Sequence, residues 1–285
     1  VLPEALERWS SDLVGRLLPR HLQIIQEIAR RLRDLVEEEF PGDDARLERM
    51  AIIANGEVRM ANLAITGSHT VNGVAALHSQ ILRDLIFRDF HELWPDRLTS
   101  VTNGVTQRRW MLHANPELSG LISSRVGEQW ITDLPRLRAL EEHVDDAEFR
   151  DQWQKIKALK KRELARLVRE STGVQLDPGM MFDVQVKRMH EYKRQLLNAL
   201  RLVDLYLNLR DNPDLDVTPR AVLFGGKAAP TYWHAKLVIK LINCLADEVN
   251  RDPLVNEKLK VAFIPDYRVT LAEIIFPGSD LSEQI

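Results

Sequence analysis

Apolar residues between Leu2 and Phe40 recur at steps of three and four, the spacing that places them on one face of a helix. Pro19 interrupts this pattern, because proline cannot donate a backbone hydrogen bond inside a helix. We therefore expect two successive amphipathic helices. The basic run at residues 30–33 falls on the second helix, and we interpret it as a solvated helix surface rather than an anion site.

Between residues 41 and 104 the elements are shorter. Residues 41–44 predict a turn and residues 44–50 a helix. Residues 58–65, which follow an Asn-Gly turn, are apolar and nearly alternating, so they fit either a strand or a buried helix. Residues 74–87 favour a helix, and residues 95–104 favour a loop. This part of the chain is therefore expected to be mainly helical.

The pattern changes after a series of helical segments that runs from about residue 108 to residue 171. Residues 181–186, 221–224 and 261–264 are short apolar segments typical of buried strands. Helical patterns at residues 195–210 and 234–249 separate them. Strands that alternate with helices in this way indicate a right-handed parallel βαβαβ unit. We therefore expect an α/β fold in the second part of the chain.

A domain boundary is expected near Asn103. Residues 1–103 would form the mainly helical end of one domain, and residues 104–285 the beginning of a doubly wound domain whose sheet stops after about three strands. The last residues, 280–285, read as the start of another helix with Ser279 as its cap. A sheet that stops so early exposes an unpaired edge, so we expect the isolated chain to be poorly soluble or to oligomerise.

Composition narrows the function. The 285 residues are 45% hydrophobic and 28% charged, with a formal net charge of −3, which excludes a disordered chain. The near-neutral balance gives no support to a nucleic-acid or anionic-membrane binder. No apolar run reaches the roughly 20 residues of a membrane helix. The single cysteine, Cys244, reads as a small core residue, and without a disulfide framework or zinc-ligand spacing we expect a cytoplasmic protein without a metal site.

Candidate functional residues follow the ends of the predicted strands, which is where parallel sheets bind ligands. Residues 187–194 follow the first strand and contain four cations, one histidine and one tyrosine. Residues 225–230, Gly-Gly-Lys-Ala-Ala-Pro, follow the second strand, and residues 266–270, Asp-Tyr-Arg-Val-Thr, follow the third. The first group alone fits either a phosphate site or a surface charge cluster. The repetition of such groups at all three strand ends favours a cleft that handles phosphate.

Several common catalytic motifs are absent from the sequence. The segment at residues 225–230 matches neither a Walker A loop nor a dinucleotide fingerprint. The patterns H-E-x-x-H, C-x-x-C and G-x-S-x-G do not occur, nor does a protein-kinase signature. Metal-dependent hydrolysis, serine hydrolysis and protein-kinase chemistry therefore lack support.

Seven segments, in order along the whole chain, closely resemble the glycogen, starch and maltodextrin phosphorylase family. They are residues 67–69, 71–74, 102–104, 108–110, 182–195, 225–230 and 280–285. The resemblance implies a GT-B fold of two Rossmann-like domains that meet near Asn103. It also implies phosphorolysis of α-1,4-glucan by inorganic phosphate to glucose 1-phosphate, and a homodimeric full-length protein.

The same resemblance implies roles for residues that would touch the substrates. Arg188 and Lys193 would hold the substrate phosphate and act in catalysis, in line with their charge. Tyr192 would contact a sugar hydroxyl. Asn103 would hydrogen-bond the glucosyl unit in the cleft between the domains. Two phosphates held close together need several cations around them, so these roles agree with the clustering of charge.

Pyridoxal 5′-phosphate is the cofactor that the resemblance implies. Lys187 would contact its phosphate, and Trp110, Tyr267 and Arg268 would line its pocket. One departure from the family pattern is Gln107, which stands where the family usually has proline. No lysine of this chain matches the Schiff-base motif of the family, so we expect the isolated chain to be catalytically inactive.

Two other functions remain open at this point. The first is a GT-B glycosyltransferase that uses a nucleotide sugar, because the fold alone does not fix the donor. The second is a non-catalytic, phosphorylase-like module whose helices before Asn103 bind a partner protein. The sequence does not distinguish glycogen, starch and maltodextrin as substrates.

Overall fold

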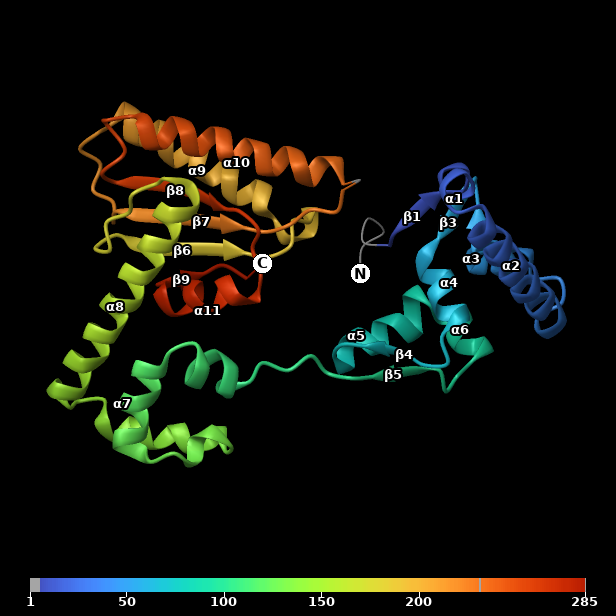
Figure 1. Ribbon diagram of the computed structural model, residues 1–285, viewed down its shortest axis with the longest axis horizontal. Helices are drawn as coiled ribbons and strands as arrows, with labels where there is room; N and C mark the ends of the chain where they lie inside the picture. The colour runs from blue at the N-terminus through green and yellow to red at the C-terminus, as the bar shows by residue number, and fades with distance from the viewer. Residues whose placement is uncertain (1–5, 231, 285) are drawn as a thin grey trace. The chain divides into compact units, whose positions relative to one another are not determined.

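A computed structural model describes residues 6–230 and 232–284. Contacts divide the chain into two compact units, Val1–Gly104 and Val105–Ile285, which are described separately below (Figure 1). Asn103 lies at the end of the first unit. That the two units are the end of one phosphorylase domain and the beginning of the next stays a prediction.

The first unit combines short helices with two small sheets. Its elements are β1 (Arg8–Ser10), α1 (Ser11–Leu17), α2 (Pro19–Glu39), α3 (Asp44–Met50), β2 (Ile53–Ala54), β3 (Glu57–Arg59), α4 (Met60–Gly67), β4 (Val71–Gly73), α5 (Ala76–Ile81), a π-helical turn (Leu82–Ile86), α6 (Arg88–Leu93) and β5 (Leu98–Ser100). β3 pairs antiparallel with β1 and β2, and β4 pairs parallel with β5. The apolar face of α2 covers a core that includes Val58 of β3 and Ile65 of α4.

Three predictions for this unit were wrong. The first helix begins only at Ser11, because Arg8–Ser10 pairs with β3 as a strand; residues 1–5 lie outside the described residues. Residues 58–65 are neither one strand nor one helix, since β3 ends at Arg59 and α4 begins at Met60. The predicted loop at residues 95–104 contains β5. In each case pairing with a distant strand outweighs the local pattern.

The solvated basic run on α2 is confirmed. Arg30 lies 2.6 Å from Asp34 and 2.9 Å from Glu27, and Arg33 lies 2.9 Å from Glu37. All of these side chains are exposed, and the pairs are three or four residues apart on one helix. Such pairs stabilise a helix by a few tenths of a kcal/mol each and leave no free cation cluster.

The second unit is a mixed helical and parallel-sheet structure, as expected. Its elements are a π-helical turn (Arg108–His113), α7 (Pro116–Val126), two 3₁₀ segments (Gln129–Ile131 and Leu134–His143), α8 (Ala147–Thr172), β6 (Met181–Val186), a 3₁₀ turn (Glu191–Lys193), α9 (Gln195–Asp211), β7 (Arg220–Gly225), α10 (Trp233–Arg251), β8 (Leu259–Ile264), α11 (Val269–Gly278) and β9 (Leu281–Ser282). The strand order is β8-β7-β6-β9, and all pairs are parallel.

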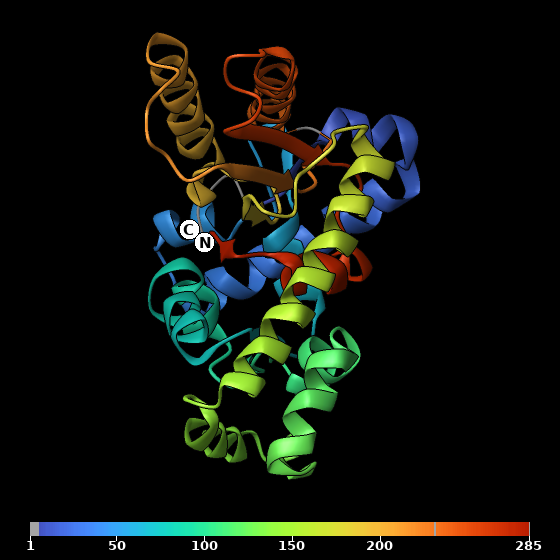
Figure 2. The same cartoon turned by 90° about the vertical axis from the view of Figure 1, so that its left-hand side faces the viewer.

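Helices cover both faces of this sheet. Val222 and Phe224 of β7 belong to the core formed with α9 and α10, whereas Ala221 and Leu223 belong to the core formed with α8 and α11. Figure 1 shows the two layers on opposite sides of the strands, and Figure 2 shows the same separation after a quarter turn. Burial on both faces explains why residues 221–224 and 261–264 read as continuous apolar segments in the sequence.

Two predictions for the second unit were also wrong. Residues 280–285 do not begin a helix: Leu281–Ser282 is β9, a fourth parallel strand beside β6, and Ile285 lies outside the described residues. Asp280 fixes this strand, because its carboxylate accepts hydrogen bonds from Phe182 N at 2.8 Å and Lys161 Nζ at 2.6 Å. Cys244 is exposed rather than buried, since it lies away from the apolar stripe of α10 that packs on the sheet.

Candidate functional site

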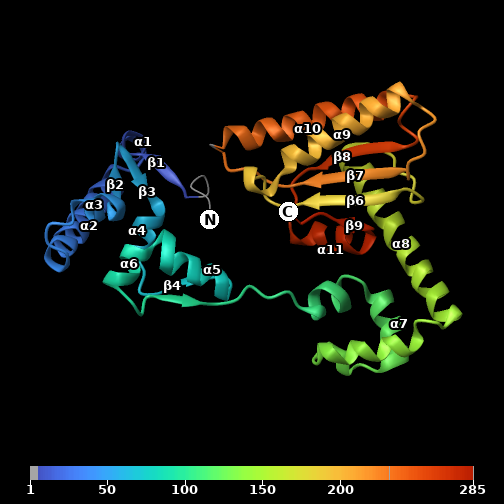
Figure 3. The same cartoon turned by 180° about the vertical axis from the view of Figure 1, so that it is seen from behind.

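The carboxyl ends of β6, β7 and β8 lie side by side in the second unit. Gly225, the last residue of β7, is paired with Val186 of β6 and with Ile264 of β8. The three strands point the same way in Figures 1 and 3. The segments that follow them are called here the first loop (residues 187–194), the second loop (residues 226–230) and the third loop (residues 265–268). The sequence-based prediction that the three strand ends share one edge is therefore confirmed.

The first loop is held against the second by main-chain hydrogen bonds. Lys187 N donates to Gly225 O at 2.8 Å, and Met189 N donates to Lys227 O at 3.1 Å. The loop ends at Arg194, whose φ of 59° is left-handed and which directly precedes α9. A residue with a side chain rarely adopts this conformation, so the surrounding contacts must fix the loop.

Gly226 permits the close crossing of the first two loops. A Cβ atom placed on Gly226 would lie 2.1 Å from the carbonyl oxygen of Lys187. The pair of glycines therefore serves backbone packing against a neighbouring loop, one of the two uses that glycine has at such a position. No residue other than glycine fits there without moving the loop that carries the cations.

The first loop presents its cations in different ways. Arg188 is exposed, and its guanidinium makes no hydrogen bond or ion pair within residues 6–230 and 232–284. Lys193 Nζ lies 5.5 Å from the centre of the Tyr192 ring, which is 40% exposed. Both cations can therefore accept an anion without first breaking an ion pair with another described residue.

Lys187 lies deeper than its neighbours. Its Nζ donates to the main-chain oxygen of Gln284, just after β9. Partial burial lowers the pKa of Lys187 below its ordinary value, and the positive charge of Lys193 lowers it further, whereas Glu283 acts in the opposite direction. A bound anion would relieve the repulsion between Lys187 and Lys193.

The cations of the second and third loops share one carboxylate. Lys227 lies 2.8 Å from Asp266 and Arg268 lies 3.0 Å from it. The hydrogen bond from Lys227, with the charge of Arg268 beside it, holds the pKa of Asp266 below its usual value. Sequence reasoning counted these cations as available and missed Asp266 as their counter-ion. The excess of positive charge therefore lies in the first loop.

Trp110 lies apart from Tyr267 and Arg268. Its ring packs edge-on against Phe276, with 5.7 Å between the ring centres, near the end of α11. Arg268 immediately precedes the same helix, and Tyr267 packs on the core between the sheet and helices α8 and α11, where burial raises the pKa of its phenol. The three proposed cofactor residues thus lie along α11 and just before it, and among the described residues no hydrogen bond or ring contact joins Trp110 to the other two.

Asn103 belongs to the first unit. Its main-chain N–H donates to Val74 O at 2.9 Å, which continues the pairing beside β4 and β5. Its side chain is exposed. The predicted glucosyl contact of Asn103 stays a prediction.

A buried carboxyl group, that of Asp183, meets the half-buried carboxyl group of Glu283 where β6 and β9 pair. Asp183 of β6 is 1% exposed, and its Oδ1 accepts no hydrogen bond from the described residues. Burial raises the pKa of Glu283, and the carboxylate of Asp183 raises it further; Arg201, 3.5 Å away, opposes this shift. A proton on Glu283 would supply the donor that Asp183 Oδ1 lacks.

This pair predicts a stability effect with a defined sign. Because the folded protein raises the pKa of Glu283, folding favours its protonated form, and the resulting stability is lost as pH rises through that raised value. In the complete protein we expect Glu283→Gln to raise the melting temperature at pH 7.5 and to have no stabilising effect at pH 4. Thermal scans of both proteins across this pH range measure the difference; a variant that is less stable at pH 7.5 contradicts it.

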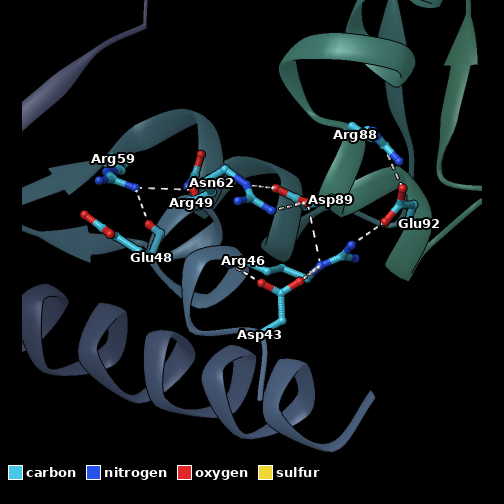
Figure 4. Close-up of polar contacts among 9 residues, drawn as sticks. All are labelled: Asp43, Arg46, Glu48, Arg49, Arg59, Asn62, Arg88, Asp89 and Glu92. Atoms are coloured by element: carbon cyan, nitrogen blue, oxygen red, sulfur yellow. Dashed lines mark hydrogen bonds and ion pairs between the residues drawn. The ribbon is translucent and has the colours of Figure 1, made fainter. Parts of the chain in front are cut away.

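The first unit contains a second polar cluster (Figure 4), and its residues Arg46, Arg49 and Asp89 line a cavity of about 850 Å³. Arg46 is its centre, 3.1 Å from Asp43 and 2.5 Å from Glu92. Arg49 lies 2.7 Å from Asp89, and Asn62 donates to Arg49 O at 3.1 Å. These bonds join α3 to α4 and α6. Both guanidinium groups already pair with carboxylates, and the buried Arg46 Nη1 has no hydrogen-bond partner among the described residues. We therefore interpret the cluster as structural and not as a second anion site.

Two general properties of the described residues complete the site. In residues 6–230 and 232–284, no helix combines the length and the hydropathy needed to cross a membrane. The same residues contain no group of three or more His, Cys, Asp or Glu side chains arranged to hold a metal ion.

Comparisons with known proteins agree on one family. A family model described as carbohydrate phosphorylase matches residues 1–285. Over its whole length the chain is 54% identical to glycogen phosphorylase of Synechocystis sp., 48% identical to glycogen phosphorylase of Chlamydia pneumoniae and 50% identical to the muscle form of glycogen phosphorylase of Oryctolagus cuniculus. It covers 34%, 35% and 34% of those proteins respectively, so the chain spans about a third of the length of these relatives.

Proposed function

The chain belongs to the carbohydrate phosphorylase family, and from this we propose that it is part of an α-glucan phosphorylase. Such an enzyme transfers a glucosyl unit from α-1,4-glucan to inorganic phosphate and releases glucose 1-phosphate. Relatives named glycogen phosphorylase, about half identical over the whole chain, support the proposal. The observation that carries it in the structure is the excess of cations in the first loop, which have no carboxylate partner among the described residues, at the carboxyl edge of a parallel sheet.

Arg188 and Lys193 are proposed to hold the substrate phosphate. Neither side chain has a carboxylate partner among the described residues, so each can bind orthophosphate directly. A guanidinium offers a planar fork that matches two phosphate oxygens. Tyr192, beside Lys193, is proposed to contact a sugar hydroxyl, and Asn103 to hydrogen-bond the glucosyl unit. Cations fixed before the reaction stabilise the charge that develops on the transferring phosphate and leaving oxygen.

Pyridoxal 5′-phosphate is the proposed cofactor, and the residues present fit its phosphate end. Lys187 is an ammonium that the described residues bind through a main-chain oxygen rather than a carboxylate, which suits a phosphate monoester. Trp110, Tyr267 and Arg268 are proposed to line the rest of the pocket. When bound, the cofactor supplies a phosphate group that can donate a proton to the substrate phosphate and take it back. This chain has no lysine in the family's Schiff-base motif.

The larger setting is proposed on the same basis. The four-stranded parallel sheet with helices on both faces supports the second domain of a GT-B fold. We propose that the full-length protein is a cytoplasmic homodimer that acts on α-1,4-glucan and phosphate.

The test compares the complete reading frame that encodes this chain with residues 1–285 alone. The complete protein should release glucose 1-phosphate from maltodextrin in proportion to added orthophosphate, and residues 1–285 should give no turnover. Consumption of UDP-glucose or ADP-glucose without a response to orthophosphate would instead indicate a nucleotide-sugar transferase. A complete protein that forms a stable dimer but has no anion affinity would indicate an interaction module. Either result contradicts the proposal.

A further inference from the structure

Three amide side chains lie buried directly beneath the first loop. Gln185 of β6 is 3% exposed, and Gln195 and Asn198 of α9 are 2% and 5% exposed. Gln195 Nε2 donates to the carbonyl oxygen of Arg188 at 3.0 Å. Gln185 Nε2 donates to the carbonyl oxygen of Lys193 at 3.2 Å. The backbones of both proposed phosphate-binding residues are therefore held from within the protein.

A chain of hydrogen bonds fixes which way the amides of Asn198 and Gln185 point. Arg201 can only donate, and its Nε and Nη2 lie 3.0 and 2.9 Å from Asn198 Oδ1. Asn198 must then turn its amide nitrogen toward Gln185, to whose Oε1 it donates at 3.0 Å. Gln185 in turn has its own nitrogen free to donate to Lys193 O. Arg201 is itself held by Asp183, whose carboxylate accepts a hydrogen bond from Arg201 Nη2 at 3.3 Å.

These amides are costly to bury unless their bonds are made. A buried polar group without a partner destabilises the folded protein, and β6 is otherwise built mainly from apolar residues that pack in the core. An apolar residue at position 185 could pack in the core beside the sheet, but it would leave the carbonyl oxygen of Lys193 without its hydrogen-bond donor. The amide groups of Gln185 and Gln195 therefore stabilise the first loop, and the sheet does not require them.

We propose that Gln185, Gln195 and Asn198 are positioning residues for orthophosphate: they set the backbone of Arg188 and Lys193 so that both cations face one phosphate. This rests on the proposed function. In this proposal phosphate binding depends on the three buried amide side chains beneath the loop as well as on the two cations. A small displacement of a charged group from its productive position is enough to weaken binding of the transferred group.

Gln185→Glu tests the proposal in the complete protein. A carboxylate of the same shape can accept from Asn198 but cannot donate to Lys193 O. At pH 7.5 we expect the KM for orthophosphate to rise about 10-fold, as for the loss of one buried hydrogen bond, and the KM for maltodextrin to change less than about 2-fold. Near pH 6, normalised to the unsubstituted protein, the effect should shrink, because the introduced carboxyl group can donate again once it is protonated. Gln185→Leu should raise the KM for orthophosphate at pH 7.5 in the same way, and this effect should not shrink near pH 6.

Asn250→Asp is the matched control. Asn250 also exchanges two hydrogen bonds with the backbone in the second unit, at 2.7 and 3.1 Å to Val261, but its side-chain bonds do not reach the first loop. Amide hydrogen exchange of residues 187–194 is measured in parallel. It should accelerate in Gln185→Glu and not in Asn250→Asp.

The outcomes separate the two proposals. If the unsubstituted protein does not use orthophosphate, the proposed function fails, and faster exchange of residues 187–194 in Gln185→Glu still supports the positioning of the loop. Unchanged exchange of these residues in Gln185→Glu overturns the positioning role. Equal losses of phosphate affinity in Gln185→Glu and Asn250→Asp overturn it as well, because a general loss of stability would then explain both.

Discussion

Replacing Arg188 by methionine in the complete protein is expected to lower kcat/KM for orthophosphate by about 10²- to 10³-fold, the usual effect of removing one preorganised donor from a charged transition state. The side chain keeps most of its volume and loses its charge. Because the guanidinium is exposed and has no partner among the described residues, the melting temperature should stay within about 1 °C of the original. Steady-state kinetics with varied orthophosphate measure the effect.

Arg210→Met is the control for this variant. Arg210 is a partly exposed arginine of the same unit that lies 3.7 Å from Asp252, so its replacement changes the net charge by the same amount away from the first loop. Arg188→Lys should recover part of the activity, since a point charge replaces the fork. Equal values of kcat/KM in Arg188→Met and Arg210→Met would show that Arg188 does not touch the phosphate.

Replacing Gly226 by alanine is expected to destabilise the folded protein more than any other single change at the strand ends. The new Cβ would lie 2.1 Å from Lys187 O, which no backbone atom tolerates, so the first loop must move. We expect a loss of about 2–4 kcal/mol in the free energy of unfolding and a fall of at least about 10-fold in kcat/KM for orthophosphate. Denaturant titration and steady-state kinetics measure the two effects.

Gly120→Ala gives the contrast. Gly120 lies inside α7, and a Cβ there meets no atom within 4 Å, so alanine should be neutral or stabilise the helix by up to about 1 kcal/mol. If Gly226→Ala behaves like Gly120→Ala in both measurements, the close packing of the first two loops does not position the cations.

The parallel sheet was predictable because its strands are buried on both faces. Residues 221–224 and 261–264 therefore appear as continuous apolar segments with a helical pattern between them, and both lie in strands of the structure. The short strands β1, β5 and β9 were not predictable. They contain three, three and two residues, too few to show a period, and they exist because a partner strand lies beside them.

The candidate site was predictable in part for a similar reason. Local clustering of charge points to residues 187–194, and Gln185 within an apolar strand was a visible signal of a buried polar contact. Asp266 shows where sequence reasoning stops, because whether its carboxylate neutralises Lys227 depends on how two loops meet in space. Cys244 likewise looked buried by its neighbours, although its position around α10 exposes it.

The central claim is that the cations of the first loop hold orthophosphate. An experimental structure of the complete protein with bound orthophosphate and maltodextrin tests it most directly. We predict phosphate oxygens within hydrogen-bond distance of Arg188 and Lys193, with Lys227 and Arg268 still paired to Asp266. Phosphate bound at Lys227 and Arg268 instead, with Arg188 turned away from it, would contradict the account.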